Sequence, residues 1–176
     1  MSVRVLVPAA AVATIVGFGL TVAVYADATK VAFPIDYAKG VRWLVVDNEA
    51  QKQVREIYAP RRTVESARKG EAMPDGMVIT LVRYSAKLNP QGSLGRDESG
   101  RLIKNEILGI NVMQKGKGWG AEYPDALRNG EWEYRAFRAD NTPNEQANLA
   151  GGFGCHKAQA SQDYIYEYDK LKTGTE

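Results

Sequence analysis

The chain has 176 residues, 44% of them hydrophobic, which suits a single domain with a core of ordinary size. Its 23 basic and 21 acidic residues nearly cancel, and the sequence has no basic block or arm, so no nucleic-acid partner is predicted. One cysteine and one histidine are present, which excludes an internal disulfide.

Residues 1–26 predict an export signal. A short basic start with Arg4 precedes an apolar run over residues 5–26, and Val24-Tyr25-Ala26 resembles a signal-peptidase site. We expect cleavage after Ala26, which leaves residues 27–176 as a mature domain in the periplasm of a bacterium. About 20 apolar residues also suffice to span a bilayer, so an uncleaved membrane anchor is the alternative.

The mature chain has several runs of β-branched and aromatic residues that predict strands. They cover residues 41–46, 77–84, 102–113, 131–138 and 163–168. Gly109 interrupts the third run and predicts a bulge or the close approach of a partner. Residues 53–59 fit either a helix or a strand. Within 131–138, we expect Glu131 and Glu133 to share a solvent-facing side.

Three short helices are predicted, over residues 62–69, over residues 123–129, and from Thr142 to the Gly151-Gly152 pair. Each ends at a glycine, which is a natural C-terminal cap, and the third begins with a Thr-Pro start signal. The strands are clustered and do not alternate regularly with helices. The predicted fold class is therefore α+β, a mostly antiparallel sheet with a few short helices.

The single cysteine and the single histidine are adjacent, as Cys155-His156. Haem attachment in c-type cytochromes uses C-x-x-C-H, and here Gly152 occupies the first cysteine position. Cys155 and His156 are therefore candidates for a thioether bond to haem and for ligation of its iron. The alternative is a buried thiol beside a structural histidine. Neither a zinc site nor a nucleophilic dyad is predicted, because ligands are too few and neighbours in an extended stretch point to opposite sides.

Four motifs between residues 74 and 164 are more specific. They are Pro74-Asp75-Gly76, Gly118-Trp119-Gly120, residues 128–134, and Cys155-His156-Lys157 followed by Gln162-Asp163-Tyr164. In these motifs residues 74–171 resemble the cytochrome P-460 and cytochrome c′-β family. The resemblance implies a small exported domain, often a homodimer, with haem c near the C-terminus. It places the proximal iron ligand on His156 and a single thioether on Cys155.

The resemblance also bears on activity. Hydroxylamine-oxidising members cross-link a lysine to the porphyrin, and the matched position falls near Leu81, with Lys87 the nearest lysine. This favours the c′-β branch, in which a five-coordinate haem binds small nitrogen-oxide ligands such as nitric oxide. Electron transfer with a redox partner protein is a second role of the same site. A haem-free binding module and a hydroxylamine-oxidising enzyme with another lysine are the alternatives.

Five residues are candidates for the pocket opposite the histidine. Tyr84, Trp132 and Tyr134 qualify by their strand positions, and Arg83 and Asn111 are polar residues within apolar runs. Core packing for the aromatic residues and exposure to water for the polar ones are the alternative expectations.

Overall fold

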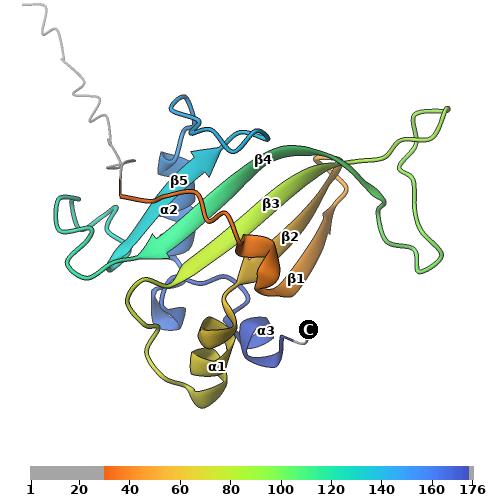
Figure 1. The fold of residues 1–176 in the computed structure, drawn as a ribbon. Helices are drawn as coiled ribbons and strands as arrows, with labels where there is room; N and C mark the ends of the chain where they lie inside the picture. Colours follow the sequence, from red (N-terminus) through yellow and green to blue (C-terminus); the bar gives the residue numbers. More distant parts are fainter. Residues whose placement is uncertain (1–29, 175–176) are drawn as a thin grey trace, which may run out of the picture.

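The computed structural model describes residues 30–174, which form a five-stranded antiparallel sheet in the order β1-β2-β3-β4-β5 (Figure 1). The strands are β1 (Val41–Asn48), β2 (Gln53–Ala59), β3 (Val78–Ala86), β4 (Lys104–Lys115) and β5 (Trp132–Phe137). The helices are η1 (Tyr37–Lys39), α1 (Arg61–Lys69), α2 (Ala150–Lys157), η2 (Ala160–Gln162) and α3 (Tyr168–Thr173). The predicted α+β class is confirmed.

The predicted export signal, residues 1–26, lies outside the described residues. Within residues 30–174, no helix has both the length and the apolar character needed to cross a membrane.

The sheet is a meander in which each strand pairs with the next one along the chain. The strands predicted over 41–46, 77–84, 102–113 and 131–138 are confirmed. Residues 53–59 form a strand because they pair with β1 on one side and with β3 on the other. The register of β3 against β4 shifts next to the pair Arg83–Gly109, so the predicted bulge at Gly109 is confirmed.

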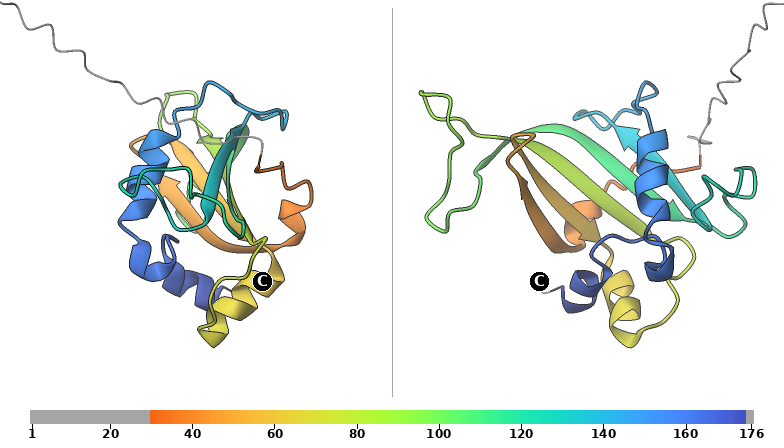
Figure 2. Two further views of the ribbon diagram at one scale, coloured as in Figure 1. Left: turned by 90° about the vertical axis from the view of Figure 1, so that its left-hand side faces the viewer. Right: turned by 180° about the vertical axis from the view of Figure 1, so that it is seen from behind.

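The two faces of the sheet carry separate cores. We call the face that carries Ile57, Ile79, Met113 and Tyr134 the helix face, because these residues pack in one cluster with residues of all three α-helices. On the opposite face Val82, Ile110, Val112 and Phe137 pack with Val31, Phe33 and Tyr37 of the N-terminal segment. Figure 2 shows α2 and the N-terminal segment on opposite sides of the sheet.

Helix α1 confirms the prediction for residues 62–69. Gly70 follows it in the left-handed conformation, with φ of 69°, and its N–H donates to the carbonyl of Ala67. The guanidinium of Arg68 donates to the carbonyls of Lys172 and Gly174, so α1 is attached to the end of α3.

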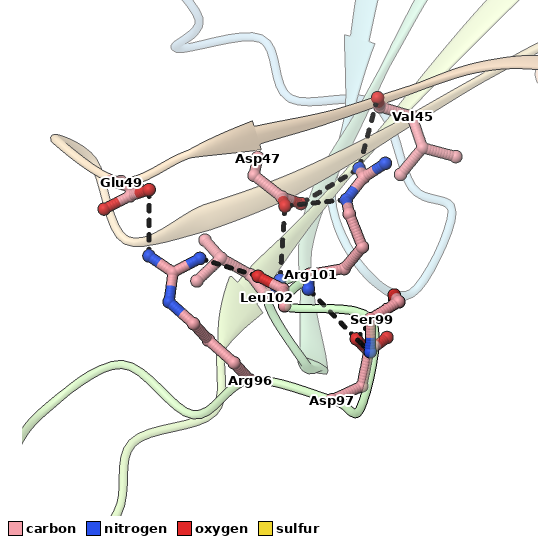
Figure 3. A network of polar contacts seen from close by, with 9 residues as sticks. Val45, Asp47, Glu49, Arg96, Asp97, Ser99, Arg101 and Leu102 are labelled. Carbon is pink, nitrogen blue, oxygen red and sulfur yellow. Dashed lines mark hydrogen bonds and ion pairs between the residues drawn. The ribbon is translucent and has the colours of Figure 1, made fainter.

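Residues 87–103, which connect β3 to β4, form an arm that extends beyond the sheet (Figure 1). Figure 3 shows how its base is fixed to β1: the guanidinium of Arg101 donates to the carboxylate of Asp47 at 2.8 and 3.1 Å and to the carbonyl of Val45 at 3.3 Å. The carboxylate of Asp97 accepts the N–H groups of Ser99 and Arg101, which closes the turn over residues 97–101.

Two predicted helices are wrong. Residues 123–129 form turns, because the guanidinium of Arg128 donates to the carbonyls of Gly120, Ala121 and Tyr123 and holds them in a loop. Residues 142–149 are not helical either. Asp140 accepts the N–H and O–H of Thr142, and Pro143 pairs with Phe137 as an extension of the sheet. The third helix starts at Ala150 and contains the glycines that were expected to end it.

The strand predicted over residues 163–168 is also wrong. Asp163 and Tyr164 both adopt left-handed conformations, with φ of 49° and 62°, so the chain turns there and α3 begins at Tyr168. The expectation that Glu133 faces solvent fails as well, because its side chain is fully buried and accepts the hydroxyl of Tyr123 at 2.8 Å.

Candidate functional site

Cys155 and His156 lie on α2 and not in an extended stretch. A helix turns by about 100° per residue, so the two side chains still point in different directions. Positions 152 and 155 are three residues apart and share one side of the helix. Gly152 therefore occupies the place from which a first haem-binding cysteine would point along with Cys155.

Phe153 attaches α2 to the helix face of the sheet. Its side chain is fully buried, and its ring centroid lies 4.6 Å from that of Tyr134 and 5.2 Å from that of Tyr123. The buried amide of Asn129 donates to the carbonyl of Phe153 and to the hydroxyl of Tyr134, both at 3.0 Å. One asparagine thus links the helix backbone to β5.

Lys157 makes a second attachment, at the end of α2. Its ammonium group donates to the carbonyls of Asp125 and Arg128 at 2.6 and 2.7 Å. Lys157 therefore fixes the end of α2 to the loop that precedes β5. The bond to Arg128 joins two of the motifs singled out from the sequence, residues 128–134 and Cys155-His156-Lys157.

The imidazole of His156 is fixed by a backbone carbonyl and two aromatic rings. Nδ1 lies 2.7 Å from the carbonyl oxygen of Tyr164, and the ring lies between those of Tyr134 and Tyr166, each at a centroid distance of 5.1 Å. A carbonyl can only accept, so Nδ1 carries the proton and Nε2 presents the lone pair that a metal would take. Burial lowers the pKa of His156 against the opposing effect of the Tyr164 bond, so the imidazole is neutral at pH 7.

Cys155 is an exposed free thiol, and the hydroxyl of Tyr166 donates to its carbonyl at 2.8 Å. A Cβ added at Gly152 would meet no atom within 4 Å, so the surface beside the thiol is open. The helix therefore offers one thiol on an uncovered side and one imidazole held in the ligating tautomer.

The helix face also carries three of the residues singled out from the sequence. Asn111 of β4 pairs with Leu81 of β3 and with Ala136 of β5, so these three side chains lie on one face of the sheet. Side chains two residues apart on a strand share a face, so Arg83 lies with Leu81, and Ala136 lies with Tyr134 on the helix face. Leu81, Arg83 and Asn111 are half-buried, and Nε of Arg83 donates to Oδ1 of Asn111 at 3.2 Å.

The three aromatic candidates for the pocket lie on different faces of the sheet. Trp132 and Tyr134 are buried on the helix face, Tyr134 in contact with the histidine ring. Tyr84 lies on the opposite face, where the ammonium of Lys104 is 4.8 Å above its ring, so it does not belong to the same site.

The family model described as Cytochrome P460 matches residues 34–167. The chain belongs to the cytochrome P460 family. Membership makes it a haem-binding cytochrome-like protein, and the match includes all five strands and α2. A search of curated proteins found no match.

The residues of this cytochrome P460 family member fit a haem c group with one covalent attachment. Haem c needs a side chain that can ligate iron and a thiol that can bond to the porphyrin, and α2 carries one imidazole, His156, and one thiol, Cys155. Sequence reasoning missed the roles of Asn129, Phe153 and the Tyr164 carbonyl. Asn129 belongs to the motif over residues 128–134, but its partner Phe153 is 24 residues away, so the motif alone does not reveal the bond.

Proposed function

We propose that this cytochrome P460 family member is an exported, periplasmic mono-haem protein that binds small nitrogen-oxide ligands such as nitric oxide. Cys155 would hold haem c by a single thioether and His156 would be the proximal ligand to iron. The observation that carries the proposal is the pairing of an exposed thiol with a neutral imidazole whose Nδ1 is occupied by the Tyr164 carbonyl.

Each residue of the proposed haem site has a separate role. When bound, haem with one imidazole ligand supplies an iron with a vacant coordination position for a diatomic ligand or for one-electron transfer. The thiol of Cys155 would form the thioether by adding across a vinyl group, with its sulfur on one carbon and its proton on the other, so that no leaving group is needed. His156 would present Nε2 to the iron, and the carbonyl of Tyr164 orients the ring through Nδ1. Arg83 and Asn111 on the helix face are the polar side chains suited to a bound nitrogen oxide.

Hydroxylamine oxidation is less well supported by the same geometry. Leu81, near the position matched to the cross-linking lysine, lies on the helix face and has no group that could bond to a porphyrin. Lys87 follows the end of β3 and is exposed in the arm.

The test is the absorption spectrum of the exported protein, produced with haem-maturation proteins, together with a pyridine haemochrome assay. The expected haemochrome band lies between those of haem with two thioethers and haem with two vinyl groups. A protein with no Soret band would refute haem binding and favour a haem-free module. The long-wavelength band for which the family is named would favour hydroxylamine oxidation.

Covalent attachment has its own test. Cys155→Ala is expected to release haem into acidified organic solvent, whereas the wild type retains it. Gly152→Ala is the matched control, because it alters the same side of α2 without removing a thiol and there is open space for its Cβ. Haem that stays with the Cys155→Ala protein would show that the thioether is elsewhere.

A further inference from the structure

The carbonyl that fixes His156 belongs to a turn with an uncommon backbone. Asp163 and Tyr164 are consecutive residues with φ of 49° and 62°. Residues with a Cβ rarely adopt the left-handed conformation, and two in succession persist only where surrounding contacts enforce them.

The contacts that enforce this turn converge on the carboxylate of Asp163. Oδ2 accepts the ammonium of Lys115 from β4 at 2.7 Å, and Oδ1 accepts the indole N–H of Trp132 from β5 at 3.2 Å. Trp132 is fully buried and the Lys115 side chain is 16% exposed, so both partners lie largely out of solvent. The N–H of Tyr164 donates to the carbonyl of Gln159 at 2.8 Å, which closes the turn.

We propose that Asp163 is a positioning residue for the haem-binding histidine. Its carboxylate, held by Lys115 and Trp132, fixes the turn that aims the Tyr164 carbonyl at Nδ1 of His156. Asp163 acts through the backbone of the next residue and has no hydrogen bond to the imidazole itself. The sheet thereby determines the tautomer and the ring orientation of a ligand that lies on a helix.

The consequence at iron rests on the function proposed above. A proximal imidazole that donates a strong hydrogen bond from Nδ1 is a more basic ligand, which strengthens the bond to iron and favours the oxidised state. A turn that is released from the sheet would lose this effect while His156 and Cys155 remain in place.

The first test needs no haem. Nitrogen NMR of His156 in the haem-free protein at about pH 8, where the imidazole is neutral, reports which nitrogen carries the proton. The wild type is expected to show the Nδ1–H tautomer alone. Asp163→Gly, which permits the left-handed backbone but deletes the carboxylate, is expected to show a mixture of both tautomers. Asp163→Asn retains an acceptor and is expected to restore most of the wild-type pattern.

Asp47→Ala is the matched control. Asp47 is likewise a carboxylate paired with a basic side chain, but its bonds to Arg101 and Leu102 fix the arm to β1 and not the turn at Asp163 and Tyr164 (Figure 3). It is expected to leave the His156 signals unchanged. Lys115→Met removes the second partner of the carboxylate and serves as an independent variant if Asp163→Gly does not fold. Wild-type His156 signals in a folded Asp163→Gly or Lys115→Met protein would refute the proposal.

The second test uses the haem-loaded protein. Asp163→Gly is expected to lower the iron–histidine stretching frequency of the ferrous protein and to make the reduction potential more positive, at unchanged haem content. An unchanged frequency and potential would refute the positioning role at iron. If the wild type binds no haem, the function fails, and the tautomer measurement still decides whether Asp163 positions His156.

Discussion

Phe153→Ala tests whether α2 is attached to the sheet as the structure has it. The side chain is fully buried, and truncation of a buried phenylalanine to alanine costs about 3–5 kcal/mol. Its ring also contacts two aromatic rings, Tyr134 and Tyr123, and each such pair adds about 0.5–1.5 kcal/mol beyond the buried area. We therefore expect the free energy of unfolding to fall by about 4 kcal/mol, a large share of the roughly 5–15 kcal/mol that is typical for a domain.

The assay is urea unfolding of the mature, haem-free protein. With a slope of about 2 kcal/mol per molar urea, the midpoint should fall by about 2 M. Phe33→Ala is the control: this ring is half-buried on the opposite face, at 5.2 Å from Phe137, and its removal should cost about half as much. A shift below about 0.5 M for Phe153→Ala, at an unchanged slope, would refute the packing of α2 against β5.

Three further predictions concern other residues. Gly154→Ala is expected to raise the free energy of unfolding of the haem-free protein by up to about 1 kcal/mol, because alanine favours a helix more than glycine does. The added Cβ would meet no atom within 4 Å. A higher Tm is the expected result, and a lower Tm would contradict the prediction. Burial opposes but does not cancel the effect of the Lys104 and Tyr58 hydrogen bonds, which hold the pKa of Glu56 below its ordinary value. The stabilisation from Glu56 is therefore present above about pH 4.5 and lost as the pH falls through the folded pKa, so thermal unfolding of Glu56→Gln should depend less on pH in that range than the wild type does. Gly152→Cys is expected to fold and, with haem-maturation proteins, to move the pyridine haemochrome band to the two-thioether position; an unmoved band would show that a thiol at 152 does not reach the second vinyl group.

The sequence by itself determined four of the five strands, whereas residues 53–59 were decided by their pairing with β1 and β3. The strands at 41–46, 77–84, 102–113 and 131–138 follow from local β-branched and aromatic runs, and α1 follows from its glycine cap, because these signals lie within the elements that they specify. It also determined the chemical pair Cys155-His156, since the spacing of a haem-attachment motif is a property of neighbouring residues.

The tertiary structure decided the surroundings of that pair. The strand predicted over 163–168 failed because Asp163 binds Lys115, 48 residues away along the chain, and Asn129, at the end of the helix predicted over 123–129, binds Phe153, 24 residues away. Side chains that bond so far along the chain override local propensity, which counts near neighbours alone.

The sequence thus supplied the histidine, and the folded sheet determined how that histidine is held. The protonated nitrogen of His156 is chosen by the Tyr164 carbonyl, and that carbonyl is placed by a turn whose aspartate is bound to β4 and β5. A hydrogen bond depends on the direction of both partners, and the direction of this carbonyl exists only once the sheet and the turn have packed together.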